Sequence, residues 1–408
     1  MEKNEIKENN LPHLVINFDI NKTIILKDKT KNYDFESCVK STIVDYAWGI
    51  FDESKKTWNL TENYLSYKRP RPELINYRKY IKIIHPNKTE EEIPEREERF
   101  KKNQEIKKLK DRLFQEFINK GQPGEKLKEI YEDYLKRIKI PKEVKNEISK
   151  ENSIYPSFYK DLYENDYIFV FPSLFRTMIE LQSQNRIFTL IFRTFGLDFE
   201  EVIKEYNDFC EGKHPLFNGS NKKYPQIKFN GENCSKDYRI TEKSIGIIYR
   251  FDENINSIYL VLGSLKRNFE IKTSEELYYY YKDRINKGEV NIIQGGKKIF
   301  EFINDNSNEG KINALCINDH YDTWYRYDKK ETCGKPMLID PDNKSVEVFF
   351  FDDNITGNES NIVDCRDTKT GKSVQDKIFR DKYLIRVDTL KAAEDEYYFL
   401  DKIKQAEK

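Results

Sequence analysis

The hydrophobic pattern of the chain predicts buried β-strands that alternate with helices. The first apolar run, LVINF at residues 14–18, is rich in β-branched and aromatic residues and ends abruptly at Asp19. Residues 186–209 join a similar strand to an amphipathic helix through a tight turn, which is typical of parallel sheets. Further strands are predicted at 311–319, 346–351, 362–365 and 382–388, with a β-hairpin at 244–263. The chain is therefore expected to have an α/β fold.

Helical periodicity dominates the charged middle of the chain. Apolar residues recur at three- and four-residue steps within 98–119 and within 125–139, and the tetrapeptide GQPG separates the two segments. This pattern predicts an antiparallel helical hairpin with one apolar stripe. Its lysines alternate with Asp and Glu, which favours a solvated face over a nucleic-acid-binding arm. Further helices are predicted at 274–287, 297–304 and 390–403.

Composition and charge exclude several classes of protein. The 408 residues include 71 basic and 71 acidic side chains, so no overall field favours nucleic acid or an anionic membrane. No apolar segment reaches membrane-spanning length and the polar N-terminus lacks a signal-peptide core, so we expect a cytoplasmic or nuclear protein without a membrane partner. The six cysteines have no CxxC spacing and there are only four histidines. A zinc site, a disulfide framework and histidine-based catalysis are therefore not predicted, which leaves carboxylate chemistry.

Polar side chains end three of the predicted strands. Asp19 ends the first strand, Thr194 ends the second, and the pair Asp352 and Asp353 ends a later one. In a parallel sheet these endings lie at one edge, where open α/β sheets bind ligands. Carboxylates from two strands suit a hard cation such as Mg²⁺, and a hydroxyl and a lysine would hold a phosphate on the other side. The sequence therefore predicts a site for Mg²⁺ and phosphate.

In these residues the chain resembles the haloacid dehalogenase-like superfamily of phosphohydrolases. The first motif of that family is similar to Asp19, Asn21 and Thr23 in FDINKT. The second, a Thr or Ser that closes an apolar strand, is similar to Thr194 in IFRTFG, and the fourth is similar to the acidic pair 352–353 in FFFDDN. The resemblance implies a phosphatase with a Rossmann-like three-layer core and a parallel sheet.

The third motif of the family is a single lysine. Lys335 in CGKPM is favoured because a Gly-Lys-Pro setting upstream of the acidic pair is similar to the family's habit. Lys329, Lys330 and Lys344 remain alternatives.

The resemblance also implies a domain organisation. A core would be interrupted by a charged helical cap and by a second insertion that contains the β-hairpin. The core comprises residues 1–60, 166–212 and 306–408, the cap residues 61–165, and the second insertion residues 213–305.

The family's chemistry is a two-step phosphoryl transfer. Asp19 would attack phosphorus to give an aspartyl phosphate, which water then cleaves. Thr194 and Lys335 would hold the phosphoryl oxygens. Mg²⁺ would be held by oxygen ligands, namely Asp19, Asp352, Asp353 and the backbone carbonyl of Asn21. The substrate would be a phosphorylated small molecule or a phosphoprotein.

Asn21 departs from the family's pattern, which has a second acid at this position. That acid protonates the leaving oxygen and later deprotonates water, whereas an amide carries no proton at neutral pH. General acid–base catalysis is typically worth about 10²- to 10⁴-fold, so we expect slow cleavage of alkyl phosphates.

Three outcomes follow from this departure. The leaving group of the substrate needs no protonation, a stand-in acid is present, or the site is silent. A silent protein would serve as a scaffold or phosphate-binding partner through the charged helices at 98–140. The candidate stand-in acids are Asp319, His320 and Asp322, and the alternative interpretation of these residues is a polar turn beside a packed Trp324.

Overall fold

The fold was analysed in a computed structural model with two compact units. The structure describes residues 11–29, 31–163, 166–196, 198–219, 227–232, 236–263, 271–308, 312–355 and 362–408. Unit 1 consists of Met1–Ile25 and Ile140–Lys408, and unit 2 is Leu26–Lys139. This division is coarser than the three predicted segments, and it groups residues 26–60 with unit 2.

Unit 1 is built on an eight-stranded sheet with the order β13-β11-β1-β5-β9-β6-β7-β8. Its strands are β1 (His13–Asp19), β5 (Phe188–Thr194), β6 (Ile245–Arg250), β7 (Ile258–Leu262), β8 (Asn291–Gln294), β9 (Ala314–Asp319), β11 (Val346–Asp352) and β13 (Leu384–Arg386). Strands from β13 to β6 pair in parallel, and β7 pairs antiparallel with β6 and with β8. The predicted α/β class, its mostly parallel sheet and the β6–β7 hairpin are thus confirmed. The strands of the predicted second insertion extend the central sheet.

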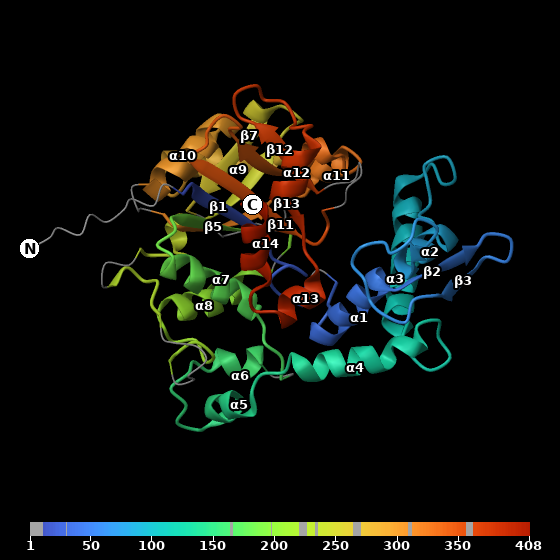
Figure 1. The fold of residues 1–408 in the computed structure, drawn as a ribbon. Helices are drawn as coiled ribbons and strands as arrows, with labels where there is room; N and C mark the ends of the chain where they lie inside the picture. The colour runs from blue at the N-terminus through green and yellow to red at the C-terminus, as the bar shows by residue number, and fades with distance from the viewer. Residues whose placement is uncertain are drawn as a thin grey trace, which may run out of the picture. The chain divides into compact units, whose positions relative to one another are not determined.

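Alternate side chains of the central strands pack against two different layers, because successive residues of a strand face opposite sides. On one side Phe18 of β1 meets Phe399 at 4.9 Å between ring centroids, and Phe192 of β5 meets Tyr206 at 5.0 Å. On the other side Val15 belongs to a core that includes residues of α10 and of a second sheet. Figure 1 shows α7 and α8 on one side of the sheet and α10 on the other. These helices are α7 (Pro172–Ser183), α8 (Phe199–Cys210), α14 (Tyr398–Ala406), which carries Phe399, and α10 (Gly296–Asn308).

The second sheet of unit 1 pairs two short parallel strands, β10 (Lys335–Ile339) and β12 (Val363–Asp367). The remaining α-helices described in unit 1 are α5 (Lys142–Ser149), α6 (Phe158–Leu162), α9 (Ser274–Asn286), α11 (Asp322–Arg326), α12 (Lys377–Tyr383) and α13 (Thr389–Glu394). The single closing helix predicted at 390–403 is wrong, because α13 and α14 are separate helices. The side chain of Asp395 accepts a hydrogen bond from the N–H of Tyr397 at 3.0 Å, and such local bonds compete with helical ones.

Unit 2 combines four α-helices with an antiparallel sheet of order β3-β2-β4. Its elements are α1 (Phe35–Tyr46), β2 (Trp48–Asp52), β3 (Thr57–Leu60), β4 (Ile75–Asn76), α2 (Tyr77–Ile84), α3 (Arg96–Glu116) and α4 (Lys128–Arg137). Aromatic rings form part of its core. Tyr77 lies between Trp58 and Phe117, at centroid distances of 5.2 and 4.3 Å.

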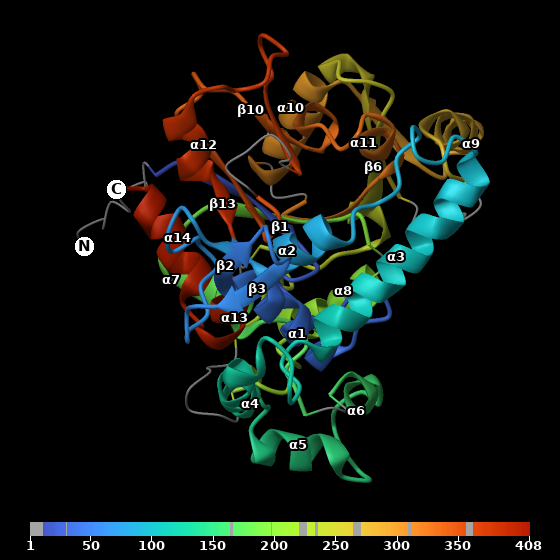
Figure 2. The same ribbon diagram turned by 90° about the vertical axis from the view of Figure 1, so that its right-hand side faces the viewer.

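The predicted antiparallel hairpin is wrong, although both of its helices are present. The axes of α3 and α4 cross, as Figures 1 and 2 show, and each helix packs against α1. Gln115 donates to the carbonyl of Ser37 at 3.1 Å, and the hydroxyl of Tyr131 donates to Glu36 at 3.1 Å. The apolar stripes of α3 and α4 therefore share α1 as a partner.

Candidate functional site

The ends of three parallel strands meet at one edge of the central sheet. Strand β1 lies between β11 and β5, with Phe18 opposite Phe351 and Asp19 opposite Arg193. The three strands run in the same direction, so the acids that end β1 and β11 leave the sheet beside Thr194 of β5. Such an edge is where open α/β sheets bind ligands.

Lys335 joins carboxylates from two of these strands. It is the first residue of β10, its side chain is 1% exposed, and its ammonium donates to Asp19 Oδ1 at 2.5 Å and to Asp352 Oδ2 at 2.9 Å. The other three candidates are exposed lysines: Lys329, Lys330 and Lys344. Of the four lysines, the structure thus brings Lys335 into the carboxylate cluster.

Asp353 completes a group of three carboxylates. One oxygen of Asp19, one of Asp352 and one of Asp353 all lie within 4.8 Å of one another. Backbone bonds hold the turn after β11: the N–H of Asn354 donates to Asp352 Oδ1 at 2.8 Å, and the N–H of Asp353 donates to Thr23 Oγ1 at 3.2 Å. The ammonium of Lys335 bonds two of these three carboxylates, and the hard oxygen donors of the group fit a divalent cation such as Mg²⁺.

Burial and neighbouring charges shift the pKa values of this cluster. Burial raises the pKa of Asp19 well above its usual value; Lys335 opposes this shift, while Asp352 and Asp353 add to it. Burial alone would lower the pKa of Lys335, but the carboxylates of Asp19 and Asp352 raise it above its usual value. Lys335 is therefore a permanent cation, and ionisation of Asp19 is favoured by any further cation bound beside it.

The loop after β1 is held in a fixed conformation. Lys22 has a φ of 60°, in the left-handed region that side chains rarely adopt. Its N–H donates to the carbonyl of Ile25 at 2.8 Å, and its carbonyl accepts from the hydroxyl of Thr389 at 2.6 Å. Thr23 Oγ1 is 3.4 Å from Asp19 Oδ2 and braces the loop against the strand end.

Asn21 connects the ends of β1 and β5 through both atoms of its amide. Thr194 Oγ1 donates to Asn21 Oδ1 at 3.2 Å, and Asn21 Nδ2 donates to Asp198 Oδ2 at 2.7 Å. The N–H of Gly196 donates to Thr194 Oγ1 at 2.7 Å, which leaves the hydroxyl proton for Asn21. A Cβ at Gly196 would lie 2.8 Å from Asn21 Oδ1, so this close approach requires glycine.

Asp198 was not among the residues predicted from the sequence. It is fully buried and precedes α8. Its position four residues after Thr194 is the one sequence signal that would have pointed to it, and an acid at the start of a helix is common for other reasons.

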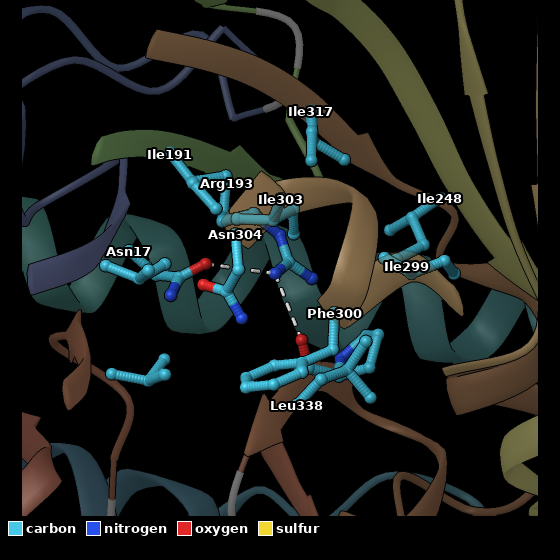
Figure 3. Close-up of a pocket in the computed structure, with 13 residues that line it drawn as sticks. Asn17, Ile191, Arg193, Ile248, Ile299, Phe300, Ile303, Asn304, Ile317 and Leu338 are labelled. Carbon is cyan, nitrogen blue, oxygen red and sulfur yellow. Dashed lines mark hydrogen bonds between the residues drawn. The ribbon is translucent and has the colours of Figure 1, made fainter. Parts of the chain in front are cut away.

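Arg193, which the sequence analysis also missed, fixes Asp319 and the strand that carries Lys335. Its guanidinium makes two bonds to Asp319, at 2.9 and 2.5 Å. It also donates to Asn17 at 3.3 Å and to the carbonyl of Pro336 at 3.0 Å, and Figure 3 shows these two bonds in a mainly aliphatic pocket. Asp319 is therefore the counter-ion of a buried arginine. The only sequence signal for Arg193 was a charged residue inside an otherwise apolar strand.

The other two candidates lie at the start of helix α11, which Asp322 begins and His320 precedes. Asp322 accepts from Arg326 at 2.8 Å and from the N–H of Ser274 at 3.3 Å, and the N–H of His320 donates to the carbonyl of Ile248. Trp324 is half-buried and packs against the core. The polar turn of the alternative interpretation is thus replaced by the first turn of α11, whereas its packed Trp324 is present.

No family model, curated protein or solved structure matches the chain. Within the described ranges, every helix is too short or too polar to cross a membrane. The geometry of the strand ends is accordingly the observation that bears on function.

Proposed function

We propose that this protein is a Mg²⁺-dependent phosphohydrolase or phosphotransferase of the haloacid dehalogenase type, with a Rossmann-like core and a cap. The observation that carries the proposal is the position of Lys335, whose ammonium lies between the carboxylates of Asp19 and Asp352. With Asp353 beside them, these groups provide a nucleophile, a cation for the phosphoryl oxygens and ligands for a metal ion.

Each residue has a separate role in the proposed reaction. Asp19 attacks phosphorus, the bond to the leaving oxygen breaks, and water then cleaves the aspartyl phosphate. Lys335 donates to a phosphoryl oxygen, where negative charge is spread in the transition state, and Thr194 does the same when its hydroxyl turns away from Asn21 Oδ1. Mg²⁺, when bound, supplies positive charge that screens the nucleophile from the phosphate. The metal ligands would be Asp19, Asp352, Asp353 and the backbone carbonyl of Asn21.

A second candidate function is a silent relative that binds phosphate or a partner protein. The observation that favours it is Asn21, whose amide makes fixed hydrogen bonds at the position of the family's proton carrier. In this alternative the charged helices at 98–140 provide the interaction surface.

Hydrolysis of p-nitrophenyl phosphate with and without Mg²⁺ separates the two functions. We expect Mg²⁺-dependent turnover that falls by at least about 10³-fold in Asp19→Asn, because the nucleophile is removed. Asp342→Asn, an exposed carboxylate outside the cluster, is the matched control and should keep wild-type turnover. Equal inertness of wild type and Asp19→Asn, with Mg²⁺ still bound, would favour the silent function.

A further inference from the structure

Aromatic side chains begin at the proposed phosphate site and continue to the surface. Phe195 follows Thr194 directly, and the ammonium of Lys335 lies 5.2 Å from the centroid of its ring. Because the same ammonium bonds to Asp19, the Phe195 ring lies beside the charges that would bind the phosphoryl group.

The rings beyond Phe195 form a continuous series. Phe195 and Trp324 stack at 5.4 Å between centroids, and Tyr321 contacts both of them edge-on at 5.4 and 5.6 Å. Tyr321 in turn stacks with Tyr325 at 5.8 Å. Exposure increases along the series, to 38% for Tyr321 and 58% for Tyr325. We call these four residues the aromatic strip.

Packing alone leaves two features of the strip unexplained. Tyrosines 321 and 325 present much of their surface to solvent, whereas core aromatics do not. In the described part of the chain, the buried Nε1 of Trp324 has no hydrogen-bond acceptor, although buried indole N–H groups usually have one. Exposed aromatic rings beside a group of polar side chains are typical of a ligand site.

The proton chemistry of the site restricts the ligand further. Asn21 carries no proton to the leaving oxygen, Asp319 is bound to Arg193, and Asp198 is fully buried behind the Asn21 amide. None of these three groups is placed to protonate the leaving oxygen, which favours a leaving group that departs without a proton. A phenol, with a pKa of about 10, leaves as its anion far more readily than an alkyl alcohol, which is a much weaker acid.

We propose that the substrates are aryl phosphate monoesters, as in phosphotyrosine, whose ring lies on the aromatic strip; this inference rests on the proposed function. A bond forms between an Asp19 oxygen and phosphorus while the bond to the phenolic oxygen breaks, and the electron pair leaves with the phenolate. The phenolate then takes a proton from solvent. Water attacks the aspartyl phosphate, which releases inorganic phosphate, frees the Asp19 carboxylate and gives a proton to solvent.

Comparison of four substrates in the presence of Mg²⁺ tests the leaving group. The probes are phenyl phosphate, a phosphotyrosine peptide, a phosphoserine peptide and adenosine monophosphate. We expect kcat/KM for the two aryl esters to exceed that for the two alkyl esters by at least about 100-fold, because the missing acid affects alkyl esters most. Adenosine monophosphate has an aromatic base but an alkyl leaving group, so it separates ring binding from leaving-group chemistry.

Each result of this comparison is decisive. Equal rates for aryl and alkyl esters would overturn the inference and leave the proposed function intact. Absence of hydrolysis for all four probes would instead overturn the proposed function. A preference for the phosphotyrosine peptide over phenyl phosphate would assign the substrate to proteins, and the reverse preference would assign it to small molecules; both support the aryl class.

Variants of the strip test the ring site itself. Phe195→Leu keeps an apolar side chain but removes the ring, and Tyr325→Leu does the same at an exposed position where folding is not at risk. We expect kcat/KM for aryl esters to fall about three- to tenfold in Phe195→Leu, with a smaller loss for alkyl esters because the ring beside Lys335 is also removed. In Tyr325→Leu we expect KM to rise for aryl esters alone. Tyr279→Leu, 69% exposed on α9, is the matched control and should match wild type. Equal losses for both ester classes, or no loss in either variant, would contradict the ring site.

Discussion

Two buried charge clusters in unit 1 contain the same kinds of group in opposite proportions. The acidic cluster consists of Asp19, Asp352, Asp353 and Lys335, and the basic cluster consists of Asp364, Arg250 and Arg366. In the first, the described contacts join one ammonium to two of the three carboxylates. In the second, two guanidiniums share one carboxylate. Both clusters bury charge, so burial does not distinguish them. The proportion of carboxylates to cations does: the acidic cluster suits a bound cation, and the basic cluster suits a structural role.

Protein groups bind most of the donors of the basic cluster, although the buried Nη2 of Arg250 has no partner among the described residues. Arg250 donates to Asp364 at 2.7 Å and to the carbonyl of Asp252 at 2.8 Å. Arg366 bonds both oxygens of Asp364, at 2.7 and 2.8 Å, and also the carbonyls of Thr332 and Gly371. These bonds connect β6, β12 and two loops, so we interpret the cluster as structural.

The largest contrast is expected when each cluster loses its central carboxylate. Asp364→Asn leaves two buried guanidiniums without a counter-ion and should lower the free energy of unfolding by about 3–5 kcal/mol. Without metal, Asp352→Asn should lower the free energy of unfolding by less than Asp364→Asn does. It should also abolish the stabilisation by Mg²⁺, which for wild type is about 2.7 kcal/mol at a Mg²⁺ concentration 100 times Kd. Urea denaturation with and without Mg²⁺ measures both. Equal Mg²⁺ stabilisation of wild type and Asp352→Asn would contradict the assignment of the acidic cluster.

Replacing a cationic side chain should lower activity in the acidic cluster but not in the basic cluster. Lys335→Met removes the proposed donor for the phosphoryl group, and we expect kcat for aryl phosphates to fall by about 10²- to 10³-fold. Arg366→Met in the basic cluster should lower stability but leave kcat within about twofold at a temperature where it is folded. Steady-state kinetics together with a thermal melt distinguishes the two variants. A large loss of kcat in folded Arg366→Met would contradict the structural interpretation of the basic cluster.

His13 provides a pH-dependent control that belongs to neither cluster. Burial and the nearby charge of Lys236 lower its pKa from 6.5 to about 4, and its ring bonds to Thr189 at 3.0 Å. The unfolded chain binds the proton more tightly than the folded chain. The free energy of unfolding should therefore rise by about 2–4 kcal/mol as the pH increases from 4 to 6.5. His13→Gln should flatten this part of the stability curve in urea titrations. An unchanged slope would show that other groups cause it.

The smallest effect is expected from Asn21→Asp. The new carboxylate would lie about 2.7 Å from the fully buried Asp198 and replace a donor with a like charge, so we expect a loss of stability of about 1–3 kcal/mol. Asn21→Asp/Asp198→Asn restores one acid and one amide and should recover that stability. Turnover of alkyl phosphates should rise in the double variant more than in the single one. A gain in turnover in Asn21→Asp that equals the gain in the double variant would mean that Asp198 does not restrict the site.

The two clusters also show which features a sequence can reveal. Asp19 and Asp352 follow apolar runs directly, so a local pattern identifies them, and parallel pairing then predicts that they share an edge. The basic cluster has no such signal, because Arg250 and Asp364 are 114 residues apart and each lies in an ordinary strand. The same holds for Asp198, whose role depends on a contact with a residue 177 positions away.

Secondary structure was predictable to the same degree and for the same reason. Strands with strong apolar runs were found, while the small sheet of β2, β3 and β4 was missed because its short strands mix apolar and polar residues. The helical hairpin predicted at 98–139 was wrong because the two helices were assumed to pack against each other. Periodicity identifies an apolar stripe, but it does not identify α1 as the surface that the stripe covers.

The most direct test is the location of the phosphoryl group during turnover. Wild-type protein is mixed with phenyl phosphate and Mg²⁺, quenched in acid within one turnover, and digested for mass spectrometry. Our account predicts a phosphorylated carboxylate at Asp19, absent from Asp19→Asn and accumulating at a rate no slower than kcat. Turnover without phosphorylation of Asp19, or with the phosphoryl group on another residue, would contradict the central role of this strand end.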